Sequence, residues 1–484
     1  MMADSGLKNM IDEIFHPRSI AVIGARSNES MENDGWVSRL VAFGFPGTIY
    51  PINPKASEIM GLRAYPTIMN VPGSVDLVIF NVPFRISDRI MADCAAKGVK
   101  FAHVFTAGFS ETGKPEGIRL QNEIERIAKE AGIRVIGPNC MGLYYPKGGL
   151  TFGRLLSNKP GPVAFVSQSG ASASRVVAQG TERGIYFSKV VSYGNAIDLD
   201  GTDFIEYLSS DPETQVIASY IEGVKDGRRY FNVIRECTRK KPVIALKAGI
   251  TEGGSRAAAS HTAVLAGSEI IWDAFFRQTG VIRVSDLEEL LDMAMAFIYL
   301  HRPAGRRVGI VGRGGGLGVV ATDMCETAGL KVPPFHLETQ KRLEQLIPDA
   351  GTSARNPVEP DRGLAAWAAF YEEGLKAIDG DPGIDIILTH LGIDIYGGIG
   401  DRLNQSLDET IAILLKLSKQ LSKPLVIVLY AGGRAETINA VLLAQQKCLE
   451  AGIPVYPSVP SAAKAISRFI GYHEFLDRKA GKPK

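Results

Sequence analysis

The sequence lacks the features that mark several classes of protein. Its 484 residues include five cysteines, an odd number without a CxxC pair, which indicates neither a disulfide framework nor a zinc site. The N-terminus has no apolar signal core, and no run approaches the roughly 20 apolar residues of a membrane helix. A formal net charge of +2 gives no sign of a nucleic-acid surface. We therefore expect a cytoplasmic protein that contacts neither membranes nor nucleic acids.

Short apolar runs that end in Gly, Asn or Ser alternate with amphipathic segments such as residues 86–97. This alternation predicts βα units and parallel sheets covered on both faces. The expected strands are residues 19–23, 47–52, 77–81, 103–106, 134–136, 163–167, 189–192, 216–221, 243–247, 307–311, 384–389 and 425–430, and a last one at Val455.

Two polar, turn-rich segments interrupt this pattern, near residues 145–149 and 301–305. The length of the chain also suits about three domains. We therefore predict an α/β protein with three doubly wound parallel-sheet domains. Their expected limits are residues 1–147, 148–301 and 302–484.

The turn after the first strand contains a single glycine, Gly24. The glycine-rich dinucleotide fingerprint is therefore absent, which disfavours an oxidoreductase that transfers hydride. The backbone amides of this turn can still hold a phosphate, helped by the positive end of the following helix. Lys55, after the second strand, could offer its ammonium group to a phosphate, although a lysine by itself is also typical of a solvated surface.

Two further turns are candidate anion sites because each joins a strand to a helix N-terminus. The first has the sequence Val-Ser-Gln-Ser-Gly-Ala-Ser at residues 166–172, and the second is the glycine-rich segment 310–318. One such turn alone indicates only a tight βα connection, whereas two can offer donors to opposite sides of a phosphoryl group. The candidate phosphate-binding residues are Ser169, Gly170, Ala171, Gly314, Gly315 and Gly316.

A loop of small residues at 251–268 follows the strand at 243–247 and contains one histidine, His261. Neutral imidazole is a nucleophile near pH 7, and the phosphoramidate it forms passes the phosphoryl group on. A histidine in an arbitrary loop is more often an ordinary surface residue. The surrounding sequence decides between these interpretations.

Ser-His-Thr at 260–262, Leu-Ala-Gly-Ser at 265–268 and the segment 276–290 resemble the phosphohistidine loop of the NDP-forming acyl-CoA synthetases, relatives of succinyl-CoA synthetase. The strand ends of the first domain resemble the CoA-binding domain of that family. The domain order resembles the alpha subunit of ADP-forming acetyl-CoA synthetases. This resemblance implies a Rossmann-like CoA-binding domain followed by two flavodoxin-like domains. It implies CoA contacts at Gly24, Ala25, Lys55, Pro83 and Asn139.

The resemblance also implies a stepwise reaction. Phosphate attacks the thioester of an acyl-CoA, which gives an acyl phosphate and CoA. His261 then takes the phosphoryl group, releases the carboxylic acid and passes the group to ADP or GDP, and the cycle also runs in reverse. By resemblance to the strand-end glutamate of the family, Glu222 holds the histidine tautomer. One histidine must visit two sites, so the loop has to move.

No segment of the sequence has the pattern of an ATP-grasp module that would bind a Mg-nucleotide, and no metal site is expected in this chain. The resemblance therefore implies a hetero-oligomer in which Mg-ADP/ATP or Mg-GDP/GTP binds to an ATP-grasp beta-type partner chain. The identity of the acyl group and the choice between ADP and GDP cannot be derived from the sequence.

Two departures from the family pattern stand out. Ala263 replaces the usual glycine after Ser-His-Thr, which puts the turnover rate in question. Residues 355–359 resemble a Gly-Asn-Pro-Val-Asp turn in which Arg355 and Glu359 differ, and we assign Asn356 only a structural or interface role. A non-catalytic CoA- or acyl-CoA-binding regulatory protein of the same fold is the alternative function.

Overall fold

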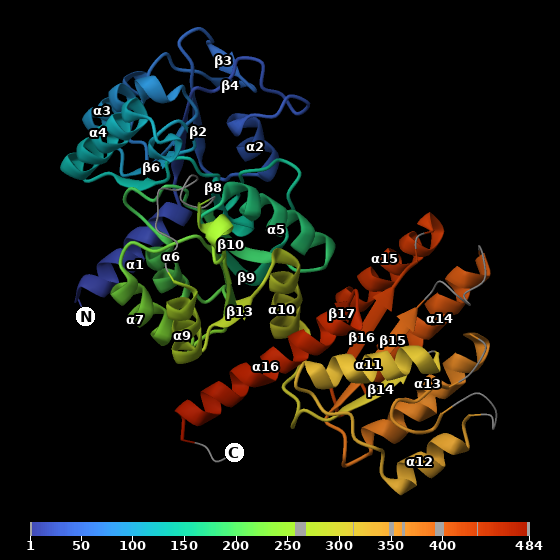
Figure 1. The fold of residues 1–484 in the computed structure, drawn as a ribbon. Coiled ribbons are helices and arrows are strands. Elements are labelled where there is room, and N and C mark those ends of the chain that lie inside the picture. Colours follow the sequence, from blue (N-terminus) through green and yellow to red (C-terminus); the bar gives the residue numbers. More distant parts are fainter. Residues whose placement is uncertain are drawn as a thin grey trace. The chain divides into compact units, whose positions relative to one another are not determined.

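The computed structural model describes residues 2–256, 268–312, 314–347, 353–360, 364–392, 401–432 and 434–481 (Figure 1). The chain forms two compact units, Met1–Leu290 and Leu291–Lys484. The first unit contains two sheets and the second contains one. Each is an open sheet with helices on both faces, as the alternating pattern of the sequence predicts.

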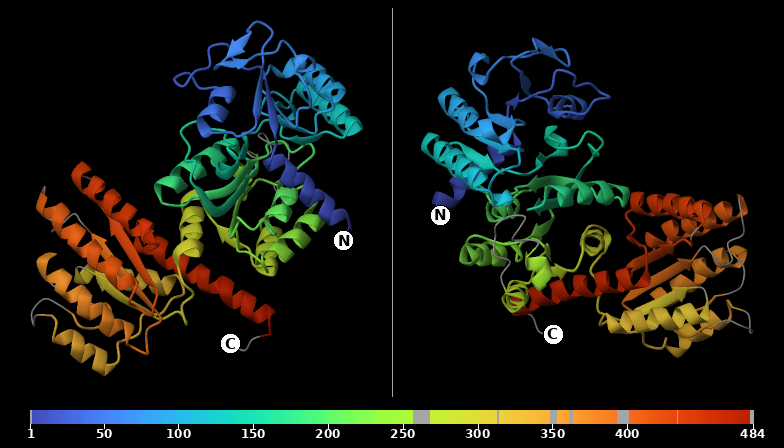
Figure 2. Two further views of the ribbon diagram at one scale, coloured as in Figure 1. Left: turned by 180° about the vertical axis from the view of Figure 1, so that it is seen from behind. Right: turned by 45° about the horizontal axis from the view of Figure 1, so that its top comes forward.

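The first sheet has five parallel strands in the order β2-β1-β5-β6-β7. Helices α3 and α4 lie side by side on one face, and α2 lies on the other (Figures 1 and 2). The direction of winding reverses between β1 and β5, and ligands of open α/β sheets bind at such a point. The strands are β1 (Ser19–Ile23), β2 (Thr48–Ile52), β5 (Leu77–Phe80), β6 (Phe101–Val104) and β7 (Arg134–Ile136), and the helices are α2 (Trp36–Phe43), α3 (Ser87–Lys97) and α4 (Pro115–Ala131).

Several short elements surround this sheet. A small antiparallel pair is formed by β3 (Glu58–Ile59) and β4 (Leu62–Arg63). The N-terminal helix α1 (Met2–Phe15) packs against α6 (Gly201–Leu208) of the next sheet, where the Phe15 ring stacks on Tyr207 with centroids 5.7 Å apart. The first and second sheets therefore share one compact unit.

The second sheet has six strands in the order β13-β12-β11-β9-β10-β8. Five are parallel, and the winding reverses between β9 and β11. Helix α5 covers one face, while α6, α7 and α9 cover the other (Figure 2). The elements are β9 (Pro160–Ser167), β10 (Phe187–Ser192), β11 (Val216–Ile221), β12 (Val243–Lys247), β13 (Ile282–Val284), α5 (Gly170–Glu182), α6 (Gly201–Leu208), α7 (Gly227–Cys237), α9 (Glu269–Thr279) and α10 (Leu287–Tyr299).

The sixth strand of this sheet, β8 (Gly142–Tyr144), pairs antiparallel with β10. The sequence pattern did not predict it, and its residues lie before the predicted boundary at residue 147. They nevertheless add an edge strand to the second sheet.

The third sheet contains the parallel strands β14-β15-β16-β17. On the outer side of β14, Lys331 and Val358 make parallel bridges to Arg307 and Val311, so the winding reverses next to β14. The elements are β14 (Val308–Gly312), β15 (Ile386–Gly392), β16 (Leu425–Tyr430), β17 (Val455–Tyr456), α11 (Gly315–Thr327), α12 (Leu337–Glu344), α13 (Leu364–Asp379), α14 (Asp401–Ser418), α15 (Ala435–Glu450) and α16 (Val459–Lys479).

Candidate functional site

The carboxyl ends of the first-sheet strands bring together four turns that contain predicted CoA contacts. Gly24 adopts a positive φ of 86°, and a Cβ atom there would lie 2.1 Å from the carbonyl oxygen of Asn81. Only glycine permits this approach of the turn after β1 to the turn after β5. The Asn53 side chain donates to the carbonyl of Ala25 over 2.7 Å, which fixes the turn after β2 to the same edge.

The remaining predicted CoA contacts lie along the same edge. Asn139 has a φ of 58°, and its backbone N–H donates a hydrogen bond to the Thr106 carbonyl over 3.0 Å. The Thr106 hydroxyl in turn donates to the Val82 carbonyl over 2.7 Å, next to the exposed Pro83. Lys55 is exposed and donates its backbone amide to Asn53 Oδ1 over 2.8 Å. These residues therefore face the solvent edge where an open sheet binds a ligand.

The first predicted anion turn begins helix α5. Ser169 is its N-cap, and the Ser169 hydroxyl accepts from the Ser172 amide over 3.2 Å. The Ser167 hydroxyl donates to the Ser169 carbonyl over 2.7 Å and so fixes the turn. Gly170 and Ala171 occupy the first two helical positions, whose amides have no acceptor within the helix. These two amides are the available donors for an anion.

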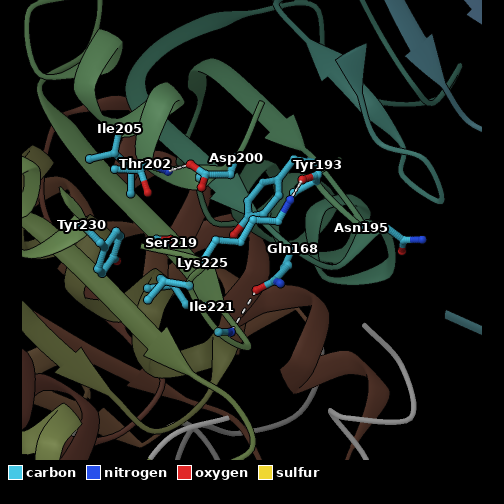
Figure 3. A pocket seen from close by; sticks show the side chains of 14 residues that line it. Gln168, Tyr193, Asn195, Asp200, Thr202, Ile205, Ser219, Ile221, Lys225 and Tyr230 are labelled. Atoms are coloured by element: carbon cyan, nitrogen blue, oxygen red, sulfur yellow. Dashed lines mark hydrogen bonds between the residues drawn. The ribbon is translucent and has the colours of Figure 1, made fainter. Parts of the chain in front are cut away.

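Glu222 lies directly after β11, the strand next to β9, and its side chain is only 6% exposed. The Gln168 side chain accepts from the amides of Glu222 over 2.8 Å and Gly223 over 3.2 Å. It thereby joins the glutamate turn to the α5 turn, and Figure 3 draws one of these two hydrogen bonds at the Gln168 side chain. Within the described part of the chain, Oε2 of Glu222 is buried and has no hydrogen-bond partner. A buried carboxylate oxygen of this kind needs a donor from elsewhere.

Lys247 is a second buried polar side chain at this edge, and sequence reasoning missed it. Its ammonium group donates to the Glu222 carbonyl over 2.8 Å and to the Ala248 carbonyl, and lies over the Trp272 ring at 5.2 Å. Burial lowers the pKa of Lys247 to about 8. The only feature of the sequence that could have indicated this buried position is a lysine at the end of an otherwise apolar strand. Lys247 therefore connects Glu222 to the start of the histidine loop.

A small pocket lies beneath Gln168, lined by side chains from the ends of β9, β10 and β11 and from α6 (Figure 3). Polar Asn195 and Asp200 and aromatic Tyr193 and Tyr230 form part of its wall. Its volume of about 20 Å³ has room for one water molecule. In this conformation the pocket is too small for an acyl chain.

The proposed carrier, His261, and the neighbouring Ala263 lie outside the described residues. The chain enters their loop from Lys247, which pairs with Ile221 in the parallel register of β11 and β12. Glu222 directly follows Ile221. The loop that contains the histidine therefore starts on the strand next to the one that presents the glutamate.

The second predicted anion turn lies in the other compact unit, after β14. Gly314 is the N-cap of α11 with a φ of 88°, and no side chain caps the helix there. Gly315 and Gly316 are the first two helical residues. Asn356 holds this region together: its Oδ1 accepts from the Ile310 amide over 2.9 Å, and its Nδ2 donates to the Val308 carbonyl over 2.8 Å. This is the structural role predicted for Asn356.

The described residues contain no group of three or more His, Cys, Asp or Glu side chains arranged to hold a metal. All five cysteines are buried and free. Within the same residues, no helix is both long and apolar enough to span a membrane.

Comparison with known families locates two domains on these sheets. Residues 18–146 match the family described as a CoA binding domain, and residues 160–297 match the succinyl-CoA ligase like flavodoxin domain. These matches coincide with the first and second sheets. Together they define the chain as part of an acid–thiol ligase.

Individual relatives agree with these two family matches. The chain is 38% identical over 458 residues to the alpha subunit of the ADP-forming acetate–CoA ligase II of Pyrococcus furiosus, covering 94% of this chain and 96% of that one. It is 39% identical to the ADP-forming acetate–CoA ligase I of Archaeoglobus fulgidus, of which it spans 55%. A solved structure of the dinucleotide forming acetyl-coenzyme A synthetase 1 of Candidatus Korarchaeum cryptofilum, in complex with phosphate and ADP, superposes with a TM-score of 0.81 at 31% identity, covering 98% of this chain and 99% of that one. The chain belongs to the family of NDP-forming acyl-CoA synthetases and corresponds to their alpha subunit.

Proposed function

We propose that this chain is the CoA-binding, phosphohistidine-bearing subunit of an NDP-forming acyl-CoA synthetase. The observation that supports this most strongly is the buried Oε2 of Glu222, which has no partner among the described residues. The Glu222 backbone is joined through the Gln168 side chain to the turn that begins α5, and Glu222 follows the strand next to the one from which the His261 loop departs. A carboxylate next to an anion site suits a histidine that must keep one ring nitrogen free to attack phosphorus.

In the first half of the proposed reaction, CoA lies along the carboxyl edge of the first sheet. Gly24, Ala25, Pro83 and Asn139 shape this edge by close backbone approach, and Lys55 offers its ammonium group to a CoA phosphate. An oxygen of inorganic phosphate attacks the thioester carbonyl of acyl-CoA. The carbon–sulfur bond breaks, and the products are an acyl phosphate and CoA.

In the second half, the amides at Gly170 and Ala171 stabilise the phosphoryl oxygens. One ring nitrogen of His261 attacks phosphorus, and the carboxylate leaves with the electrons of the P–O bond. Glu222 accepts a hydrogen bond from the other ring nitrogen and stabilises the positive ring that forms. The phosphohistidine then transfers its group to a nucleoside diphosphate.

The final transfer requires a nucleotide site. We propose that an ATP-grasp beta-type partner chain binds Mg-ADP/ATP or Mg-GDP/GTP, and that the two chains form a hetero-oligomer. The Archaeoglobus relative, which this chain spans only in part, supports this proposal. The anion turn at Gly314, Gly315 and Gly316 offers a further set of free amides for the phosphoryl group.

We also propose the functional division into residues 1–147, 148–301 and 302–484, which is supported by three separate sheets. We propose a cytoplasmic location, because five buried, unpaired thiols suit a reducing compartment.

The test uses the purified chain, labelled inorganic phosphate and a panel of acyl-CoAs. We expect acid-labile, base-stable label on the wild-type chain and on His301→Ala, which replaces an exposed histidine, and none on His261→Ala. The acyl-CoA that gives the most label identifies the acyl group. CoA binding without label for any acyl-CoA, with or without the partner chain, would refute catalysis and favour the regulatory alternative.

A further inference from the structure

His390 is a buried histidine that the proposed reaction does not use. It lies on β15, its side chain is 1% exposed, and within the described residues its Nε2 atom has no hydrogen-bond partner. Leaving a buried polar atom without a partner destabilises the folded chain. Such an atom in a well-packed sheet therefore requires an explanation.

The ring lies over the start of the second anion turn. His390 pairs in register with Gly312, the last residue of β14. A Cβ atom on Gly312 would lie 1.7 Å from Nε2 of His390 and 2.1 Å from Cδ2. Glycine at this position therefore makes room for the ring, and Nε2 is the ring atom nearest to the place that a Cβ atom of Gly312 would take.

The same turn begins helix α11, and among the described residues no side chain accepts from its first amides. No side chain caps the helix at Gly314, and the first backbone bond of the helix runs from the Gly318 amide to the Gly314 carbonyl over 3.0 Å. Helix α5 differs, because the Ser169 hydroxyl accepts a hydrogen bond from one of its first amides, that of Ser172. At α11, by contrast, the first-turn amides and the histidine nitrogen all have unfilled hydrogen-bonding capacity.

The sheet topology also favours a ligand here. Val358 bridges Val311 on one side of β14, and β15 pairs on the other. The winding therefore reverses at β14, and the space outside the carboxyl ends of strands at such a reversal is where open α/β sheets bind ligands.

We propose that Nε2 of His390 donates a hydrogen bond to a phosphoryl oxygen that is held by the free amides of α11, so that ring and turn form one anion site. This inference rests on the proposed function and adds a side-chain contact to it. Burial lowers the pKa of His390 to about 4. The ring is therefore neutral at pH 7 and contributes an N–H donor rather than a charge.

A matched pair of variants tests this proposal, because the two amide side chains mimic different ring nitrogens. In His390→Gln the amide nitrogen reaches the position of Nε2, whereas in His390→Asn it reaches only that of Nδ1. His390→Leu keeps the bulk and removes the donor. Thr389→Val is the control: it removes a buried hydrogen bond of 3.0 Å to Tyr371 from the neighbouring residue of the same strand.

Equilibrium dialysis of the full chain with labelled inorganic phosphate gives the primary result. Because the α5 and α11 turns are two separate candidate phosphate sites, the binding curves are fitted with two sites. We expect His390→Leu and His390→Asn to weaken one of them roughly tenfold, the loss typical of a hydrogen bond to a charged group, and to leave the other unchanged. His390→Gln and Thr389→Val should bind like the wild type. If His390→Leu does not fold, the difference in phosphate affinity between His390→Gln and His390→Asn still tests the role of the ring nitrogen.

Equal phosphate affinity in all variants, or no phosphate binding by the wild type, would overturn the proposal. The fate of the proposed function is measured separately, as His261 labelling from acyl-CoA in the same preparations. If the wild type labels and His390→Leu needs no more phosphate for half-maximal labelling, the function stands and the role of His390 does not.

Discussion

At the scale of single residues, the account depends on polar side chains that are buried at strand ends. Glu222, Gln168 and Lys247 come from three neighbouring strands and connect the anion turn of α5 to the entrance of the histidine loop. Gln168 and Lys247 hold backbone groups, whereas one carboxylate oxygen of Glu222 has no hydrogen-bond partner in the described part of the chain. Their roles can therefore be separated by substitution.

Glu222→Gln removes the charge while keeping the size of the side chain. We expect the rate of His261 labelling to fall on the order of a hundredfold, because an amide stabilises the positive ring poorly. CoA affinity should not change. Glu236→Gln, at an exposed glutamate of α7, is the control. Rapid-quench labelling measures the rate, and an unchanged rate in Glu222→Gln would refute the role of this carboxylate.

Lys247 makes stability depend on pH in a defined direction. Burial lowers its pKa from 10.5 to about 8, so between these values the folded chain binds fewer protons than the unfolded chain. The free energy of unfolding contributed by this group therefore rises with pH in that window. Relative to Lys247→Met, the wild type should gain up to about 3 kcal/mol between pH 8 and 10.5.

Urea denaturation across this pH window measures the difference. Lys240→Met, at an exposed lysine, controls for the general effect of removing a charge. A wild-type minus Lys247→Met difference that stays flat with pH would show that the lysine is not desolvated.

At the scale of elements, turns that follow strands determine where ligands bind. Gly24 is the clearest case, because its positive φ and its approach to Asn81 both require glycine. Gly44 provides a matched comparison: it has a φ of 75° at the end of α2, but nothing lies within 4 Å of a Cβ atom there.

Gly24→Ala should therefore lose CoA affinity, while Gly44→Ala should lose only the roughly 1–2 kcal/mol of stability that a left-handed backbone costs. The added methyl in Gly24→Ala pushes the turns after β1 and β5 apart. Isothermal titration with CoA and thermal melting of both variants test this. If Gly24→Ala binds CoA as the wild type does, this turn does not form the CoA site.

The sequence predicted elements well wherever a continuous apolar run filled a buried strand. The ends of β1, β11, β12 and β16 agree with the expected residues. The three-residue strands β8 and β13 were not predicted, although β7, which is equally short, was; strands of this length are too short for their periodicity to identify them consistently. β6 ends at Val104, two residues before the expected end, and the Thr106 hydroxyl beyond it bonds to the neighbouring turn.

Some buried polar residues could be predicted from the sequence and others could not. Ser169, Gly170 and Ala171 were placed correctly at the start of α5, because a serine after a buried strand is a recognisable N-cap. Lys247 and His390 gave no comparable signal. Their burial depends on Trp272 and Gly312, which lie far from them in the sequence and meet them only in the folded chain.

For the whole molecule, we propose that this chain carries out the acyl and phosphoryl steps and that a partner chain binds the nucleotide. Formation of the phosphohistidine should therefore proceed with the chain's own residues, whereas turnover to ATP or GTP should require the second chain. Adding an ATP-grasp partner and a nucleoside diphosphate to the labelled chain should remove the label and produce labelled nucleotide. Label that leaves as inorganic phosphate alone would contradict the transfer step.

The most direct test of the central claim is a single-turnover count of free CoA and of label on His261, in the same quenched samples of the chain with acyl-CoA and labelled phosphate. The account predicts that each CoA released is matched by one phosphohistidine, and that His261→Ala abolishes the label. CoA release without label on His261 in the wild type, or label that persists in His261→Ala, would contradict the account.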